Sequence, residues 1–238
     1  MTTRPMHPPG GAPPSLKRED FTEERIQRFA ELALRAGFRV TTQAEREASL
    51  RDTLARRPAG TDVWVFGFGS LMWNPAMHVA ESRPARITGY RRRFCLDQRY
   101  GRGSPEVPGA MLGLDEGGEI HGVAHRIAEE LLQDELTILW RREMPSGAYL
   151  PEWIEAEVGG EARAVLTFVS DRAHSRYIDL PESELVARLA MAEGQSGTNR
   201  AYLYETVECL EALGIDDPYL TGIASKVRGY RVRRGLEP

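Results

Sequence analysis

The sequence predicts an α+β fold: a mixed, mainly antiparallel small β-barrel or sheet with peripheral helices. Strand patterns fill most of the middle of the chain, and helix patterns stand before and after them. Successive strand segments are joined by short glycine-bearing turns, which favours hairpins over the strictly alternating strands and helices of a doubly wound sheet. We therefore expect the sheet to be the scaffold on which the helices pack.

The beginning of the chain predicts a tail and a helical appendage. Residues 1–16 are rich in Pro and Gly and offer little to bury, which predicts a disordered tail. Residues 17–60 are heavily charged with modest apolar stripes, and a Thr-x-x-Glu capping pattern begins at Thr42. We expect this appendage to pack on a catalytic domain over 61–230. Its two helices are expected at about 22–36 and 43–56.

The domain itself opens with a buried strand at Val63, where a Val-Trp-Val-Phe run leads into glycines. The segment Asp115–Gly118 is expected to be a hairpin turn, and a second turn is expected at Gly159 and Gly160. The later strands are expected at about 85–96, 109–114, 119–127, 150–158 and 162–169. Helices are expected at about 128–144, 182–193, 198–213 and 217–227.

The composition excludes several classes of function. Acidic and basic residues are nearly balanced, at 35 against 31, so no field of one sign would recruit nucleic acid. Two cysteines are too few for a disulfide framework and indicate a reducing compartment. No apolar run suits a signal peptide or a membrane span, so we expect a cytoplasmic protein without membrane insertion.

The first candidate site is the loop Gly67–Met72, at the end of the buried strand. Two glycines there leave the backbone free to present consecutive N–H groups, which bind carboxylates or developing oxyanions. Gly-x-Gly is also common in ordinary tight turns, so both interpretations stay open on spacing alone. A dinucleotide fingerprint fails because Met72 stands where the third Gly is needed.

The second candidate is Glu143, at the end of the predicted 128–144 helix. The negative end of the helix dipole repels a carboxylate there, so another interaction or a functional requirement must explain its presence. One explanation is a catalytic acid or base with a pKa raised toward neutrality. The alternative is a solvated side chain paired with Arg141 or Arg142.

Other chemistries are not supported, and we expect neither metal nor cofactor. His121 and His125 are four residues apart, but their context indicates a strand, which would hold them about 13 Å apart. Ser70 does not fit the Gly-x-Ser-x-Gly motif of a serine-hydrolase nucleophile, because Met72 stands where the second Gly is needed. Cys95 stands in an apolar strand pattern that favours core packing over reactivity.

Four motifs in order along the chain resemble the ChaC-type, glutathione-specific γ-glutamylcyclotransferases. The order and spacing match over about 63–220. The motifs begin at Val65 (VFGFGSLMW), Gly89 (GYRRRF), Arg141 (the RRE segment up to Tyr149) and Gly197 (GTNRAYL).

The resemblance implies an enzyme that opens glutathione to 5-oxoproline and Cys-Gly, with Glu143 as the acid/base. It also implies a small-molecule substrate pocket at the Gly-Phe-Gly-Ser-Leu loop. Phe68 departs from the family's usual Tyr at this position. The expected substrate-binding residues are Gly67, Phe68, Gly69, Ser70, Leu71, Met72, Tyr149 and Tyr202. Two alternatives stay open: a cyclotransferase for other γ-glutamyl compounds, or a non-catalytic ligand-sensing module.

Overall fold

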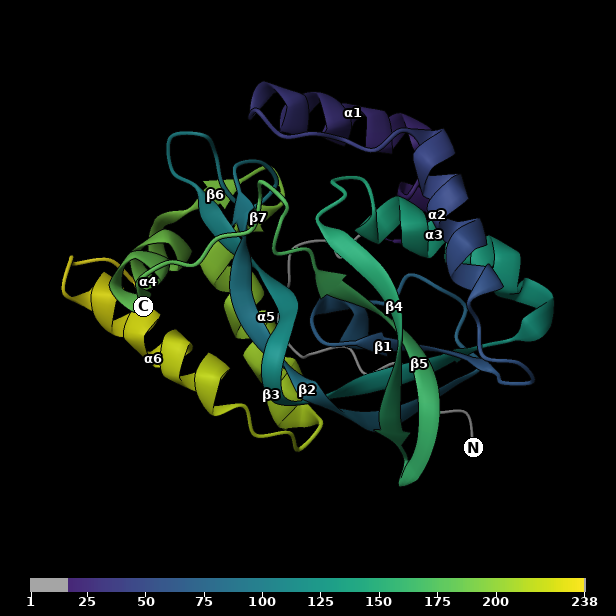
Figure 1. Ribbon diagram of the computed structural model, residues 1–238. Coiled ribbons are helices and arrows are strands. Elements are labelled where there is room, and N and C mark those ends of the chain that lie inside the picture. Colours follow the sequence, from purple (N-terminus) through teal and green to yellow (C-terminus); the bar gives the residue numbers. More distant parts are fainter. Residues whose placement is uncertain (1–16, 238) are drawn as a thin grey trace.

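The computed structural model describes residues 17–237, and its centre is a closed five-stranded barrel (Figure 1). The strands are β1 (Val63–Gly67), β2 (Glu81–Gln98), β3 (Gly109–Ile127), β4 (Tyr149–Val158) and β5 (Glu161–Ser170). They follow the order β1-β3-β2-β4-β5 around the barrel. Neighbours are antiparallel except for β5, which pairs in parallel with β1, where Val65 is opposite Leu166, and with β3, where Leu114 is opposite Val169. The predicted mixed, mainly antiparallel barrel is confirmed. The predicted tail, residues 1–16, lies outside the described residues.

The predicted hairpin turn at Asp115–Gly118 is wrong. β3 runs through this segment and pairs with β2 on both sides of it, with one register shift opposite Gly89. The backbone φ angles of Gly117 and Gly118 are 99° and 79°. Glycine at positive φ serves a β-bulge as well as a turn, so the sequence alone does not separate the two. The first residue of the segment, Asp115, is buried inside the strand.

The helices fall within a few residues of their predicted positions, and they cover the barrel from two sides (Figure 1). On one side, α4 and α5 pack against β3 and α6 packs on both of these helices, and on the other side α2 packs on α3. Among the described residues, no helix is long and apolar enough to cross a membrane. The helices are α1 (Glu23–Arg35), α2 (Gln43–Ala55), α3 (Leu132–Glu143), α4 (Glu182–Met191), α5 (Asn199–Ala212) and α6 (Pro218–Val232).

The core that positions α3 is shared between the barrel and helices α2 and α3. Leu50 of α2 and Trp140 of α3 belong to the same buried cluster as Val65 and Phe168 of the barrel. Trp140 and Phe168 meet edge to face, with ring centroids 5.4 Å apart. The C-terminal end of α3 is therefore held against the barrel by packing along its whole inner face.

Candidate functional site

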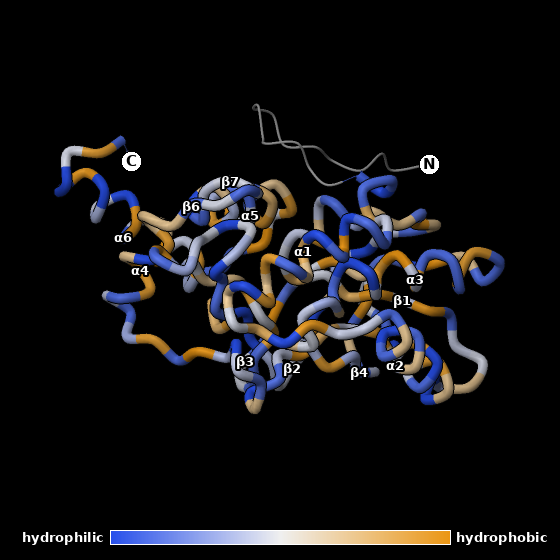
Figure 2. Tube along the Cα trace, turned by 90° about the horizontal axis from the view of Figure 1, so that it is seen from above, coloured by the Kyte–Doolittle hydropathy of each residue, from blue (hydrophilic) through white to orange (hydrophobic). Residues whose placement is uncertain are grey.

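A cavity of about 1020 Å³ lies between the barrel, the end of α3 and the N-terminal helix α1. Seen from above in Figure 2, α1 lies between α3 on one side and α5 on the other. A short hairpin of β6 (Glu193–Gly194) and β7 (Gly197–Thr198) adds to the lining. Four of the residues predicted from the sequence line this cavity together: Ser70, Glu143, Tyr149 and Tyr202.

Glu143 is the last residue of α3, and its side chain is 17% exposed. Its Oε1 lies 2.9 Å from Nε of Arg142. The same guanidinium donates from Nη2 to Oγ of Ser70 at 2.8 Å, and from Nη1 to the carbonyl of Asn74. Arg142 therefore ties the carboxylate to the loop that follows β1.

The surroundings of Glu143 favour a carboxyl group that can change protonation state. Burial raises the pKa of Glu143, and the positive charge of Arg142 only partly opposes this. The orphaned carbonyls at the end of α3 find a partner in the N-terminal segment, because Oγ1 of Thr41 donates to the carbonyl of Met144 at 2.8 Å. Glu143 is thus paired with Arg142 and lines the cavity, and its role as acid/base stays a prediction.

The Gly67–Met72 loop leaves strand β1 and forms one short 3-10 turn. Within the described part of the chain, the amides of Ser70 and Leu71 find no acceptor. Gly69 has φ near −137°, so its role is close approach, not a left-handed backbone. A Cβ added there would lie 2.9 Å from Oη of Tyr202. The loop and α5 are therefore packed as closely as glycine allows.

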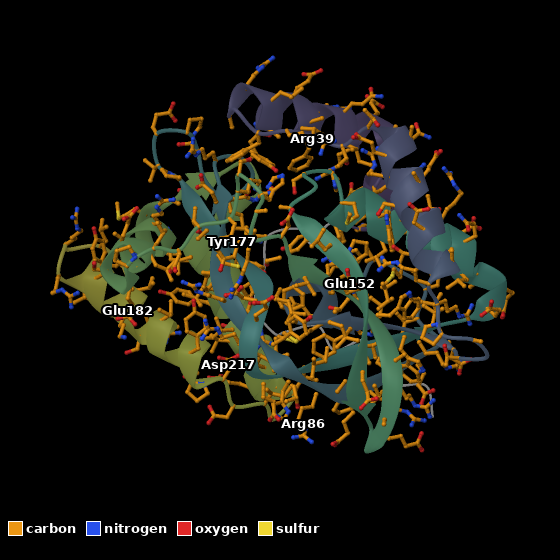
Figure 3. The ribbon with its side chains drawn as sticks, in the orientation of Figure 1. Arg39, Arg86, Glu152, Tyr177, Glu182 and Asp217 are labelled. Atoms are coloured by element: carbon orange, nitrogen blue, oxygen red, sulfur yellow. The ribbon has the colours of Figure 1, made fainter. Side chains whose placement is uncertain are left out.

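Two buried side chains hold the carbonyls of this loop from behind. Nε2 of His125 donates to the carbonyl of Leu71 at 2.9 Å, and burial lowers the pKa of this histidine to about 4, so the ring is neutral. Nε of Arg92 donates to the carbonyl of Phe68 at 2.5 Å. Arg92 is itself ion-paired with Asp217, which Figure 3 labels at the start of α6. The loop is thus fixed by residues of β2, β3 and α6.

The two histidines lie on strand β3, as the sequence predicted. His125 faces the interior, whereas His121 is exposed beside Glu119. His125 accepts a hydrogen bond on Nδ1 from Oγ of Ser82 at 2.9 Å. With Nε2 donating to the Leu71 carbonyl, both ring nitrogens are engaged within the protein. The role of His125 is to position the loop.

Two tyrosines form the floor of the cavity near Glu143. Oη of Tyr149 donates to the carbonyl of Leu112 at 2.9 Å, so this hydroxyl oxygen can still accept a hydrogen bond. The ring of Tyr202 packs edge to face on Phe94 and lies under the guanidinium of Arg102. Burial raises the pKa of both phenols, so both stay neutral at physiological pH.

Several predicted residues lie behind the lining. The ring of Phe68, which we expected at the wall of the site, lies instead in the core beside Trp64 and Ile87, and is 7% exposed. Leu71 and Met72 are buried in two other apolar clusters. None of these residues, nor Gly67 or Gly69, is in the lining of the cavity. Side chains at the end of a strand alternate in direction, and the sequence does not say which of them faces a cavity.

Sequence analysis missed other members of the lining. Arg142 could have been found, because it adjoins Glu143 in the chain. No local signal marks Arg102 and Arg176, which arrive from distant segments. The contribution of α1 to the cavity wall was also not predicted, because a charged helix with a modest apolar stripe has the pattern of a peripheral helix.

Comparison with known proteins agrees with this architecture. A model of the ChaC-like protein family matches residues 63–230. A protein of Escherichia coli (strain K12) named glutathione-specific gamma-glutamylcyclotransferase is 43% identical over 186 residues, which cover 77% of this chain and 80% of that protein. Gamma-glutamylcyclotransferase 2-3 of Arabidopsis thaliana is 34% identical over 176 residues, covering 70% of this chain and 88% of that protein.

A solved structure shares the fold at low identity. It is a crystal structure of a γ-glutamyl cyclotransferase specific to glutathione from yeast, with a TM-score of 0.67 and 22% sequence identity. The match covers 72% of this chain and 98% of the yeast chain.

Proposed function

The chain belongs to the ChaC-like family, and from this premise we propose that it is a γ-glutamylcyclotransferase that degrades glutathione to 5-oxoproline and Cys-Gly. The observation that carries the proposal is the position of Glu143: a carboxylate that is only 17% exposed, has a raised pKa, lines a large cavity and is tied through Arg142 to the loop after β1. A general base works best when its pKa is moved toward neutrality.

In the proposed reaction the α-amine of the glutamyl group attacks its own γ-carbonyl carbon. A new C–N bond closes the five-membered ring, and the bond from the γ-carbon to the cysteine nitrogen breaks. Glu143 takes one proton from the α-ammonium before the attack, and the ring nitrogen loses a second proton as the lactam forms. The leaving nitrogen gains both protons and departs as the α-ammonium of Cys-Gly, so Glu143 ends as the carboxylate. Because the attack is intramolecular, positioning alone supplies part of the rate enhancement.

Anionic oxygen of the substrate is assigned to the amides of Ser70 and Leu71, which find no acceptor within the described residues. Either the γ-carbonyl oxygen, as it becomes an oxyanion, or the glutamyl α-carboxylate would suit these donors. The neutral phenols of Tyr149 and Tyr202 line the same space and complete the substrate-binding set that we propose. The rest of the loop contributes backbone and shape.

The cellular setting that we propose is the cytoplasm. Cys95 and Cys209 are both free thiols, which suits a reducing compartment. The proposed substrate, a small thiol peptide, is itself typical of such surroundings.

The proposal is tested by incubating the purified protein with glutathione and, separately, with γ-glutamyl-alanine, and measuring 5-oxoproline by mass spectrometry. We expect 5-oxoproline and Cys-Gly from glutathione, and much less 5-oxoproline from γ-glutamyl-alanine. Release of 5-oxoproline from γ-glutamyl-alanine alone would move the function to other γ-glutamyl compounds. Tight binding of glutathione without any product would identify a ligand-sensing module.

A further inference from the structure

The wall of the cavity formed by the N-terminal segment is mainly apolar. On α1 and just before it, the apolar residues that line the cavity follow a helical spacing on one face, with Phe21 placed ahead of the helix. They are Phe21, Ile26, Phe29, Ala30 and Ala33, and the ion pair of Arg25 with Asp20 lines the cavity beside them. On the barrel side, Leu96 and Met111 add apolar lining to the same cavity.

This apolar face is separate from the main core, although Phe21, Ile26 and Ala33 are themselves buried. None of its five side chains belongs to the apolar clusters that fill the barrel and pack the helices, within the residues that the structure describes. Phe29 and Ala30 are only half-buried. An amphipathic helix normally turns its apolar face to a core, so a face turned to a cavity points to an apolar ligand group.

The face is continuous with the proposed catalytic centre. The guanidinium of Arg142 lies over the ring of Phe21, 5.7 Å from its centroid, and the same guanidinium binds Glu143. A γ-glutamyl group placed at Glu143 therefore has the remainder of its peptide within the same enclosed space as α1.

The size of the cavity exceeds what the γ-glutamyl group requires. Sites that bury a drug-sized ligand measure about 300 to 1,000 Å³, and this cavity of about 1020 Å³ reaches the top of that range. Of the groups that follow the γ-glutamyl bond in glutathione, the glycine carboxylate is charged and suits Arg102 or Arg176 in the lining. The cysteine sulfur is the atom that can carry an apolar substituent.

We propose that the apolar face of α1 is a subsite for a substituent on the cysteine sulfur, and that glutathione S-conjugates with apolar groups are substrates of this site. The inference rests on the proposed function and names its substrate class. The bonds made and broken are those of the proposed reaction. The products are 5-oxoproline and the S-substituted Cys-Gly, and no oxidant, reductant or co-reactant is needed.

The test compares glutathione, S-methylglutathione and S-hexylglutathione as substrates of the full chain, with 5-oxoproline as the measured product. One methylene in an apolar pocket changes specificity by roughly tenfold or more, so we expect KM for S-hexylglutathione to be at least ~10-fold below that for S-methylglutathione. Calorimetric titration of the Glu143→Gln variant with both conjugates measures binding separately from turnover, and we expect the same order of affinity.

A variant on α1 locates the subsite. Ala30→Trp fills the space beside Phe29, and we expect kcat/KM for S-hexylglutathione to fall at least ~10-fold more than kcat/KM for glutathione. The matched control is Leu34→Trp, since Leu34 is on the same helix, 61% exposed and outside the lining. We expect the control to leave kcat/KM unchanged for both substrates.

The outcomes separate the two proposals. If glutathione yields 5-oxoproline but S-hexylglutathione does not, the S-conjugate subsite is rejected and the proposed function stands. The subsite is also rejected if Ala30→Trp lowers kcat/KM equally for both substrates, or if Leu34→Trp has the same effect as Ala30→Trp. If no substrate yields 5-oxoproline, the proposed function is rejected together with this inference.

Discussion

The two walls of the cavity are built in different ways. The wall that carries Glu143 and Ser70 belongs to the barrel and α3, and it is backed by buried clusters and by the side chains of His125 and Arg92. The α1 wall has no part in those clusters, within the residues that the structure describes, and ion pairs of the buried Arg46 with Glu23 and of Arg18 with Glu135 hold its edges.

The family match follows the same division. It covers residues 63–230 and leaves out α1 and α2. A rigid wall suits chemistry that depends on fixed geometry, whereas an added wall can change the shape of the cavity without disturbing that geometry. Variants of the first wall should therefore affect kcat, and variants of the second should affect the choice of substrate.

The largest effect is expected for Glu143→Gln. This variant keeps the shape of the side chain and removes the titratable group, so kcat should fall at least ~10²-fold. Folding should not suffer. The pKa of Glu143 is raised in the folded protein, so the folded wild-type protein loses stability as the pH rises through that pKa. The Glu143→Gln variant has no such group and should not show this loss. Steady-state kinetics and thermal melts at pH 5 and pH 8 measure both effects. Near-normal turnover would remove Glu143 from the mechanism.

A slightly smaller effect is expected from crowding the loop. In Gly69→Val, the new Cβ would lie 2.9 Å from Oη of Tyr202, so either the loop or α5 must shift, and we expect kcat/KM to fall about 10²-fold. Ser70→Ala removes only a hydroxyl group, so kcat/KM should fall less than about tenfold if the backbone amides are the main donors. Equal losses in the two variants would assign a direct role to the Ser70 hydroxyl.

Removing Arg142 should change the pH dependence more than the maximal rate. Its positive charge lowers the pKa of Glu143, so in Arg142→Met that pKa rises. The base must be ionised to accept a proton, and the acidic limb of kcat/KM against pH should move upward by about one unit. The decrease in kcat/KM should be about tenfold at pH values on the acidic limb and smaller at high pH.

Arg141→Met is the matched control for this prediction. Arg141 is the neighbouring residue on the same helix, but its Nε lies 3.9 Å from Oε2 of Glu23, whereas Arg142 pairs with Glu143, the proposed acid/base. Its pH profile should keep the wild-type position. A limb that does not move in Arg142→Met would show that another group sets it.

The smallest effect on activity is expected for Phe68→Tyr. The ring is in the core with Trp64 and Ile87, so the added hydroxyl would be buried without a partner and should cost ~1 to 3 kcal/mol of folding free energy. KM for glutathione should stay unchanged. Chemical denaturation and steady-state kinetics of this one variant decide the matter. A lower KM with unchanged stability would place position 68 in the substrate site.

Much of the fold could be predicted because the relevant signals are local. The Val63 strand, the Gly159 and Gly160 turn and the end of α3 at Glu143 follow from apolar spacing and from turn residues within a few positions. The exception, Asp115–Gly118, shows the limit of such signals. Two glycines with positive φ serve a turn or a bulge equally, and only pairing with β2 decides between them.

By itself the sequence determined which residues could do the chemistry: a carboxylate at a helix end and a glycine loop after a buried strand. The tertiary structure decided which of them meet. It brought Ser70, Glu143, Tyr149 and Tyr202 into one cavity, turned Phe68 into the core, and placed α1 across the opening as an apolar wall. The physical reason is that periodicity fixes the direction of a side chain only relative to its own element. The surface that each face meets is set by packing between elements far apart in the chain.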